Sequence, residues 1–369
     1  MSTIGMTIAD LDTPCLLVDL DRLKTNIRTW QATINAAGAA LRPHVKTHKT
    51  PDIARVQLDA GACGITAAKL SEAEVFAAAG CDDIFVAYLV IGAQKWRRAA
   101  ELARSIRLIV GVDSLVGARG LSDAATSAGS RIAVRVEIEQ GPSRSGVTLD
   151  CALQLCRDIL LLPNLDLDGI FAYRSVFYLG ASDYAPEQSG QREGEEMVAV
   201  AEALRASGIP IRSVSIGSTP TARAAARVPG VTEVRPGTYV FGDYVMAERG
   251  VTPYETLALS ILCTVVSRPA SDLATGDGGS KTFSGDISPA VEGLRGYARA
   301  VDSEAYLERM SEDRGVVRLG AGVDPAIGDR LAFFPIHVCT AVNLSDELIG
   351  VRNGRVETVW PILARGKRT

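Results

Sequence analysis

The sequence predicts a closed (β/α)8 barrel of the TIM type, followed by a second, mostly β domain. From residue 15 to about residue 245, short β-rich runs alternate with longer helical patterns. Repeated strand-then-helix units form a parallel sheet with helical crossovers, and about eight such units in this length fit a closed barrel. After residue 246, strand-like runs are separated by Gly, Asp and Pro turns instead. An open, doubly wound sheet is the alternative architecture for the first domain.

The expected barrel strands are short runs rich in aliphatic and β-branched residues. They cover residues 15–20, 41–46, 64–68, 83–89, 106–112, 132–139, 167–173 and 213–217. Helical patterns lie between them, and those at 21–38 and 194–208 end in glycine, as helices often do. We therefore assign residues 15–245 to the barrel.

The second domain is assigned to residues 246–369 together with the N-terminal segment 1–14. Its strand-like runs alternate with turn residues rather than with helices. These runs lie within residues 256–269, 314–320, 329–344 and 348–363. One helical pattern accompanies them, near residues 303–311.

The composition excludes several classes of function. The 369 residues carry a formal net charge of -4 without an internal basic run, so neither nucleic acid nor an anionic membrane is an expected partner. The seven cysteines are scattered and form no CxxC pair, which favours a reducing cytoplasm over a disulfide scaffold. No export signal is found, and no apolar stretch approaches the roughly 18 residues of a membrane span. We expect a cytoplasmic protein that acts on a small molecule.

Residues 42–51, RPHVKTHKTP, contain two of the three histidines of the chain and two lysines, at the expected end of a strand. In a (β/α) barrel the catalytic groups lie at the C-terminal ends of the strands. A lysine at this mouth can form a Schiff base with an aldehyde cofactor. A cluster of solvated surface residues is the alternative interpretation, and the residues alone leave both open.

The chain resembles a known family in six ordered motifs along nearly its whole length. They are TPCLLVDLDRLKTNI, LRPHVKTHKTPDIA, VEIEQGPSRSGV, SVSIGSTPTA, EVRPGTYVFGD and FFPIHVCTAVNL. The resemblance is to the fold-type III pyridoxal-phosphate enzymes, whose barrel is shared with alanine racemase. Within them, the chain is most similar to the group containing D-threonine aldolase, D-serine dehydratase and 3-hydroxyaspartate lyases.

The resemblance implies that Lys46 bears pyridoxal 5'-phosphate and takes the α-proton of the bound amino acid. His44 is expected to line the same pocket, with His48 and Lys49 lining or supporting it. Tyr173 and Arg174, in the loop after strand 167–173, are further catalytic candidates. Solvated side chains are the alternative interpretation of each.

Further residues match positions that contact the cofactor. Arg144 would lie beside the phenolic oxygen, and Arg235 matches the arginine on the pyridine nitrogen of alanine racemase. The run GST after a strand can hold a phosphate with backbone N–H groups and hydroxyls. The complete set of expected cofactor-binding residues is Lys46, Arg144, Tyr173, Gly217, Ser218, Thr219, Arg235, Gly237 and Tyr239.

His337 and Cys339 are candidate metal ligands. They are two positions apart in PIHVCT, on an expected strand, so alternation would put both side chains on one face. A thiolate with an imidazole favours zinc, and two protein ligands leave positions open for water or substrate. A packed strand is the alternative interpretation. The resemblance implies that a divalent metal, zinc or else manganese, binds the β-hydroxyl of the substrate at this pair.

Two reactions are compatible with this resemblance. Loss of the β-hydroxyl of D-serine, D-threonine or 3-hydroxy-D-aspartate would give a keto acid and ammonia, whereas Cα–Cβ cleavage would give glycine and an aldehyde. Aldolases of this group often have a histidine base in the loop after strand 167–173. Here that loop, FAYRSVFYLGASDY, contains none, only Tyr173, Arg174, Tyr178 and Tyr184. We therefore favour a dehydratase, with a D-threonine aldolase-type enzyme as the alternative.

An amino-acid racemase and a non-catalytic pyridoxal-phosphate carrier are further alternatives. The HVC motif disfavours both, and the second domain also disfavours the carrier. Arg174 and Arg314, the latter in SEDRG where many relatives have SEEHG, raise the hypothesis that the substrate carries an additional anionic group. Two solvated arginines are the other interpretation.

The stretch 272–286 contains Asp277, Gly278 and Gly279. It resembles the β-domain loop that approaches the active site of the partner subunit in fold-type III enzymes. The resemblance therefore implies a homodimer with its active sites at the interface.

Overall fold

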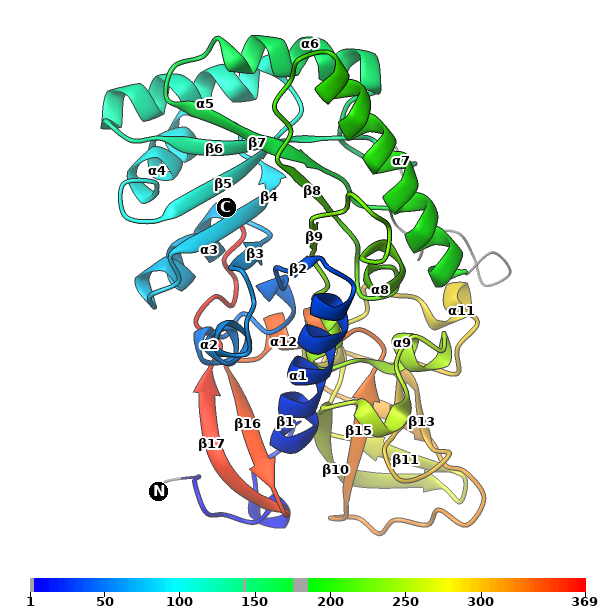
Figure 1. Ribbon diagram of the computed structural model, residues 1–369. Helices are drawn as coiled ribbons and strands as arrows, with labels where there is room; N and C mark the ends of the chain where they lie inside the picture. Colours follow the sequence, from blue (N-terminus) through cyan, green and yellow to red (C-terminus); the bar gives the residue numbers. More distant parts are fainter. Residues whose placement is uncertain (1–2, 142–143, 175–184) are drawn as a thin grey trace.

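The computed structural model of the chain describes residues 3–141, 144–174 and 185–369. Two sheets organise these residues (Figure 1). One has eight parallel strands in the order β2-β9-β8-β7-β6-β5-β4-β3. The other has nine strands, mostly antiparallel, in the order β11-β14-β13-β12-β15-β10-β1-β16-β17. The predicted pairing of a parallel barrel with a mostly β domain is confirmed.

The eight parallel strands curve around until the first and last come together. His44, just beyond β2, forms a parallel bridge with Thr66 of β3, and the Thr66 N–H donates to the Pro43 carbonyl at 2.8 Å. The barrel strands are β2 (Ala40–Leu41), β3 (Ile65–Ala67), β4 (Asp83–Leu89), β5 (Arg107–Val112), β6 (Ile132–Glu137), β7 (Leu165–Phe171), β8 (Ser213–Ile216) and β9 (Glu233–Val234).

Helices cover the outside of this sheet. In α1, Leu23, Ile27, Trp30 and Ile34 follow the three-and-four spacing of one helix face and are buried. The Asp19 carboxylate accepts from two backbone N–H groups of the first turn of α1 and so fixes where it begins. The helices of the barrel are α1 (Leu20–Ala36), α2 (Pro51–Asp59), α3 (Leu70–Ala78), α4 (Ala93–Leu102), α5 (Leu115–Ala128), α6 (Leu149–Leu160), α7 (Pro186–Ala206) and α8 (Ala222–Ala225).

The β domain is built around the nine-stranded sheet. Its strands are β1 (Cys15–Asp19), β10 (Leu259–Ala270), β11 (Leu273–Gly276), β12 (Ala298–Ala300), β13 (Tyr306–Met310), β14 (Gly315–Arg318), β15 (Arg330–Pro335), β16 (Glu347–Arg352) and β17 (Arg355–Pro361). Short helices lie between the barrel and this sheet or within its connections. They are α9 (Tyr244–Glu248), α10 (Ser280–Phe283), α11 (Pro289–Glu292) and α12 (Val338–Leu344).

Three element predictions are wrong. Residues 15–20 were expected in the barrel, but β1 pairs with β10 and β16 of the β domain. The eighth barrel strand is instead β9, two residues long and not predicted. The helical pattern near 303–311 contains strand β13, because pairing with β12 and β14 outweighs local propensity.

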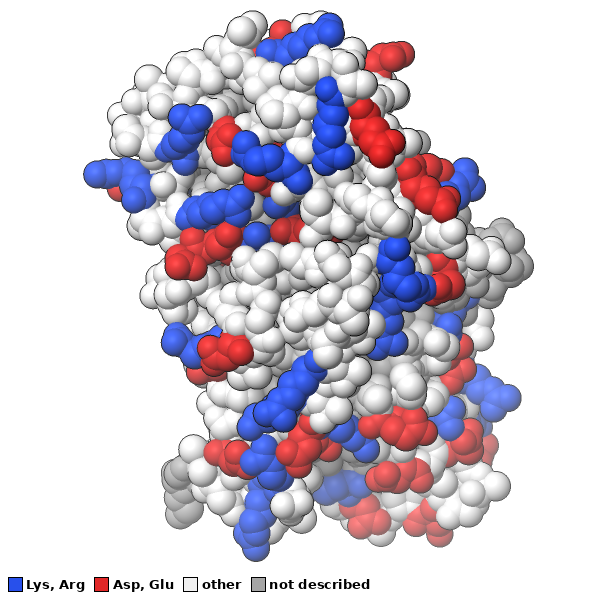
Figure 2. All heavy atoms as spheres, in the orientation of Figure 1, with Lys and Arg blue, Asp and Glu red and all other residues white. Residues whose placement is uncertain are grey.

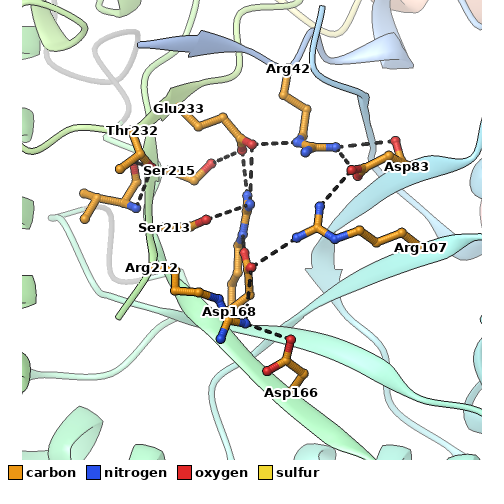
Figure 3. Close-up of polar contacts among 12 residues, drawn as sticks. Arg42, Asp83, Arg107, Asp166, Asp168, Arg212, Ser213, Ser215, Thr232 and Glu233 are labelled. Carbon is orange, nitrogen blue, oxygen red and sulfur yellow. Dashed lines mark hydrogen bonds and ion pairs between the residues drawn. The ribbon is translucent and has the colours of Figure 1, made fainter. Parts of the chain in front are cut away.

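The barrel interior is filled by an ionic layer and an aromatic layer. Near the N-terminal ends of the strands, Arg135 binds Asp168 at 2.7 Å and Glu233 at 2.6 Å, and Arg42 binds Glu233 and Asp83, both at 2.6 Å (Figure 3). The aromatic layer, formed by Phe85, Ile109, Ala133 and Phe171, packs against these groups, with the Phe85 ring 4.7 Å from the Arg135 guanidinium. Ser215 links the ionic layer to Arg235, because its hydroxyl donates to Glu233 and accepts from the Arg235 guanidinium, each at 2.6 Å.

Residues 362–369 leave β17 and run back along the barrel, so that the last residue lies beside α3 (Figure 1). The Ala364 N–H donates to the Lys49 carbonyl at 3.1 Å, and the Ser71 N–H donates to the Thr369 carbonyl at 2.8 Å. Ile362 and Ala364 are buried. This segment thus joins the β domain to the strand ends of the barrel.

Acidic and basic side chains are interspersed on the face of the molecule shown in Figure 2. This mixture agrees with the small net charge of -4. Among the helices that the structure describes, none is both long and apolar enough to span a membrane.

Candidate functional site

Lys46 lies in a single 3₁₀ turn, η2 (Val45–Thr47), directly after β2. The sequence predicted a strand through residue 46, but the ladder of β2 ends at Leu41. His44 caps the turn, because its Nδ1 accepts from the Lys46 backbone N–H at 3.4 Å. The Lys46 side chain is exposed, while Val45 and Thr47 on either side of it are buried. The turn is therefore anchored by its two buried residues and presents the amine of Lys46 at the barrel mouth.

The imidazole of His44 supports this turn in its uncharged form. Burial lowers the pKa of His44 well below its usual value, and the positive charges of Lys46 and Arg235 lower it further. A hydrogen bond to the Thr66 backbone holds the ring on the neighbouring strand. The imidazole is therefore uncharged next to the amine of Lys46.

His48 and Lys49 lie behind the turn and do not face the mouth. The His48 ring is buried, its Nε2 contacts Gln57 Oε1 at 3.2 Å, and its Nδ1 accepts from the Thr50 N–H at 3.1 Å. Lys49 Nζ forms a buried ion pair with Glu72 Oε1 at 2.5 Å. These two residues support the pocket, and do not line it.

The loop after β8 contains the predicted phosphate-binding run. Gly217 has a φ of 82°, in the left-handed region that favours glycine, so the chain turns sharply out of the strand. The Ser218 N–H donates to the Thr221 hydroxyl at 2.9 Å. Thr219 Oγ1 accepts from the Tyr239 N–H at 3.1 Å, which joins this loop to the one after β9.

Glu193 of α7 holds the predicted phosphate-binding run in place through hydrogen bonds, and this role of Glu193 was not predicted. Its carboxylate accepts from the Gly217 N–H at 3.3 Å, from the Thr221 hydroxyl at 3.0 Å and from the Arg174 N–H at 3.2 Å. Burial raises the pKa of Glu193. A single glutamate in a helical pattern gives no signal of this role in the sequence. Because the Gly217 N–H donates to Glu193 and the Ser218 N–H donates to Thr221, the hydroxyls of Ser218 and Thr219 remain as the candidate phosphate donors of this run.

Gly237 and Tyr239 act through packing. A Cβ on Gly237 would lie 2.8 Å from Thr47 Oγ1 and 2.9 Å from the His44 carbonyl, so only glycine lets this loop approach the lysine turn. The Tyr239 hydroxyl accepts from Gln57 Nε2 at 2.8 Å inside the core, and only its backbone N–H faces the loop after β8. Tyr239 therefore supports the predicted phosphate loop without offering its hydroxyl to it.

Arg235 lies at the top of the aromatic layer, under the barrel mouth. Its guanidinium donates to Ser215 Oγ at 2.6 Å and to the Ala172 carbonyl at 2.7 Å, and stacks 5.5 Å from the Phe85 and Phe171 rings. Burial lowers the pKa of Arg235 to about 10. Within the described residues no carboxylate forms an ion pair with it, so its charge is balanced only through dipoles and more distant acids.

Arg144 and Tyr173 meet at the rim. The Arg144 guanidinium lies 4.9 Å from the Tyr173 ring centroid. Beside them, Glu137 at the end of β6 accepts from the Ser145 hydroxyl at 2.9 Å, and burial raises the pKa of Glu137. Glu137 was not predicted, because an acidic residue at a strand end gives no distinctive pattern.

Arg174 forms an ion pair with Glu196 at 2.7 Å and donates to Gln140 at 3.2 Å. Arg314 is exposed in the β domain, next to Gly279. The two arginines that were candidates for an anionic substrate group are therefore in different surroundings, one paired and one solvated. Tyr178 and Tyr184 lie outside the described residues.

His337 and Cys339 belong to the start of α12 and not to a strand, because β15 ends at Pro335. The prediction that strand alternation brings them together is wrong. The two side chains nevertheless interact, because each is hydrogen-bonded to the other. Asp243 accepts from the Val338 N–H at 3.2 Å and fixes the turn between them.

The electrostatics of this pair suit a metal ligand set. Burial raises the pKa of Cys339, but the charges of His337 and Lys46 outweigh it, so the thiol pKa lies below its usual value. Burial lowers the pKa of His337, but the charge of Cys339 and the hydrogen bond to Asp286 outweigh burial, so the pKa lies well above its usual value. No group of three His, Cys, Asp or Glu side chains comes together as a metal site in the described part of the chain. The pair thus supplies two candidate metal ligands, a thiol of lowered pKa and an imidazole.

The lysine turn and the HxC pair are in direct contact. Thr47 Oγ1, one residue from Lys46, lies 3.3 Å from Cys339 Sγ. The Thr238 hydroxyl lies 3.9 Å from the same sulfur. Elements from three distant parts of the chain therefore meet at one point of the barrel mouth.

Comparison with known proteins agrees with this architecture. The family model "Alanine racemase, N-terminal domain" matches residues 18–245, and "Putative serine dehydratase domain" matches residues 258–351. A D-threonine aldolase from Arthrobacter sp is 36% identical over 98% of this chain and 95% of its own. A D-threo-3-hydroxyaspartate dehydratase from Delftia sp. (strain HT23) is 36% identical over 90% and 92%, respectively.

Solved structures give the same picture. The crystal structure of D-threonine aldolase from Filomicrobium marinum has a TM-score of 0.91 at 30% identity, with all of both chains covered. Two solved variants of D-threo-3-hydroxyaspartate dehydratase, 34% and 35% identical, have TM-scores of 0.88 and 0.89 and coverage of at least 96% of both chains. One replaces a cysteine by alanine and is in a metal-free form; the other replaces a histidine two positions before that cysteine.

Proposed function

Because this chain belongs to the family that joins an alanine racemase N-terminal domain to a serine dehydratase domain, it is a pyridoxal-phosphate-dependent lyase for β-hydroxy-D-amino acids, and we propose that it is a metal-dependent dehydratase. The relatives of similar identity include both aldolases and dehydratases, so family membership leaves the bond that breaks undecided. Its substrate would be D-serine, D-threonine or 3-hydroxy-D-aspartate, and its products a keto acid and ammonia.

The observation that carries this proposal is the contact between the lysine turn and the HxC pair. Thr47 Oγ1 lies 3.3 Å from Cys339 Sγ, which brings the amine of Lys46 and a candidate metal site to the same side of the barrel mouth. A β-hydroxy amino acid has a Cα proton and a β-hydroxyl on adjacent carbons. One substrate can therefore meet both groups at once.

The residues at the mouth fit pyridoxal phosphate. Lys46 supplies an exposed amine, Ser218 and Thr219 supply phosphate donors, and Arg144 and Arg235 supply cations near the remaining polar atoms of such a group. When bound, the cofactor acts as a sink for the electrons left on Cα when a bond there breaks. We assign to Lys46 Nζ the covalent attachment of the cofactor and the removal of the Cα proton. The neutral His44 keeps a second charge away from that amine.

His337 and Cys339 fit a divalent metal, with zinc as the proposed ion. A thiolate and an imidazole are ligands that zinc prefers, and a catalytic zinc keeps positions open. Held there, the metal would act as a Lewis acid on the β-hydroxyl leaving group. The solved relative whose cysteine variant is in a metal-free form supports the same pair.

The aldolase reaction needs a base for the proton of the β-hydroxyl, and the three histidines do not offer one. His48 is buried behind the turn and His44 is hydrogen-bonded to two backbone groups. His337 is bound to Asp286 and Cys339. This distribution favours dehydration, in which the β-hydroxyl leaves with its proton and no such base is required.

The first experiment is product analysis. Purified protein supplied with pyridoxal phosphate and zinc or manganese is incubated with D-serine, D-threonine and D-threo-3-hydroxyaspartate. We expect a keto acid and ammonia in equal amounts. Glycine and an aldehyde as the main products would overturn the proposal in favour of an aldolase.

A second experiment tests the metal pair. His337→Ala and Cys339→Ala should abolish lyase turnover while the visible absorbance of the bound cofactor remains. Cys151→Ala, at an exposed cysteine of α6, is the matched control and should keep full turnover. Unchanged turnover in Cys339→Ala would remove the metal from the mechanism.

A further inference from the structure

Asp286 is hydrogen-bonded to the His337 ring. It follows α10 in the connection to α11, and its Oδ2 accepts from His337 Nδ1 at 2.7 Å. An ionised carboxylate can only accept hydrogen bonds, so the proton of the ring must be on Nδ1. With Nδ1 donating to Asp286, Nε2 is the ring nitrogen left for Cys339 or, in place of that hydrogen bond, for a metal.

Asp286 is itself held in place before any metal arrives. Its Oδ1 accepts from the Thr340 hydroxyl at 2.8 Å and from the Ser284 hydroxyl at 2.9 Å. Thr340 lies in the first turn of α12, the helix that His337 caps. Ser284 has a φ of 67°, in the region that non-glycine residues rarely adopt, and this bend directs its hydroxyl back to Asp286. With Oδ1 occupied by two donors, Oδ2 is left for His337.

We propose that Asp286 is the positioning residue of the metal site: it holds the His337 ring in one tautomer and one orientation, so that Nε2 faces the metal beside Cys339. This inference rests on the proposed metal pair. Carboxylates that accept from the second ring nitrogen of a ligating histidine recur at metal sites, where they orient the ring and raise its basicity. Asp286 does not touch the substrate in this role.

The test measures zinc affinity of the pyridoxal-phosphate-loaded enzyme by competition with a chromophoric chelator. Asp286→Ala should weaken zinc binding about 10- to 100-fold, the range found when such partners are removed. Asp286→Asn keeps the shape of the side chain and one acceptor oxygen, so its loss of zinc affinity should lie between that of Asp286→Ala and that of the control. Asp324→Ala is the matched control, because Asp324 is an exposed acid of the same domain paired with Arg268 at 2.8 Å.

Two further measurements separate the possible failures. Cofactor absorbance and far-UV circular dichroism should be the same in all variants, which excludes loss of the fold. If His337→Ala leaves zinc affinity unchanged, the metal site itself is refuted, and the role of Asp286 with it. If His337→Ala loses zinc but Asp286→Ala and Asp286→Asn both match Asp324→Ala, only the role of Asp286 is overturned.

Discussion

At the scale of single residues, His48 links stability to pH. Burial lowers the pKa of His48 to about 4, against a usual value near 6.5. The unfolded chain therefore binds a proton between these values that the folded chain does not. The stabilisation is fully present above pH 6.5 and is lost as the pH falls towards 4.

We predict that the wild-type protein loses about 2 kcal/mol of unfolding free energy through this one group between pH 7.5 and pH 5. His48→Asn keeps an acceptor for the Thr50 N–H but cannot be protonated in this range. Urea unfolding of both proteins at the two pH values should show a smaller pH effect in the variant. Equal pH effects would contradict the assigned protonation state of His48.

Residues at the site differ in how far the sequence predicts them. Lys46, His337 and Cys339 are predicted, because a motif and its order along the chain mark them, and the structure brings them to one place. Glu193 and Asp286 are not, because each acts through hydrogen bonds to groups far away in the sequence. A buried acid that organises a loop has the same local pattern as a solvated acid.

At the scale of elements, the close contact of Gly237 with η2 controls where Lys46 lies. Gly237 has an ordinary φ of -121°, so the requirement for glycine comes from space and not from backbone conformation. The Cβ of an alanine would push against the His44 carbonyl and Thr47 Oγ1. The turn that carries Lys46 would have to move.

Gly237→Ala should therefore lower kcat/KM by up to about 100-fold, since displacement of a reacting group by about 1 Å has that effect. Gly276→Ala is the control, because its new Cβ would have no neighbour closer than 3.6 Å. Steady-state kinetics on both variants check this. Wild-type kinetics in Gly237→Ala would show that the turn tolerates the added methyl group.

The elements themselves were predicted where they are long and periodic. Helix α1 and strands β4 to β7 follow their patterns closely, but β9 has two residues and so no period to detect. Strand β1 has a buried aliphatic pattern like that of a barrel strand, and only its partners β10 and β16 distinguish it. Sheet membership is a long-range property that a five-residue pattern does not contain.

At the scale of the whole molecule, the ionic layer ties the barrel strands together. Arg135 of β6 bridges Asp168 of β7 and Glu233 of β9, and all three side chains are buried. Arg107 of β5 extends the layer to Asp83 and Asp168. Removing one buried partner leaves uncompensated charges, which costs more than the pair itself contributes.

Arg135→Met should lower the unfolding free energy by about 3–5 kcal/mol, because Asp168 and Glu233 would each lose a buried cation. Arg104→Ala removes an exposed ion pair with Glu101 and should cost at most about 1 kcal/mol. Chemical denaturation measures both. A loss in Arg135→Met no larger than in Arg104→Ala would show that the layer contributes little to stability.

The proposed assembly is a homodimer in the cytoplasm. The proposed partner contact is the connection 272–286, in which Gly278 and Gly279 are themselves buried against the rest of the chain. Size-exclusion chromatography with light scattering should give twice the chain mass of 39.0 kDa. A fully active monomer would refute the dimer.

The path of residues 362–369 has a consequence for biosynthesis. The lysine turn leaves the ribosome early, but its neighbours Pro236 and Ala364, which bond to His44 and Lys49, are translated much later. A chain that lacks residues 362–369 would contain all eight barrel strands but would lose the Ala364 N–H that donates to the Lys49 carbonyl just after the lysine turn. The backbone just after the turn that carries Lys46 is therefore completed by a segment more than 300 residues further along the chain.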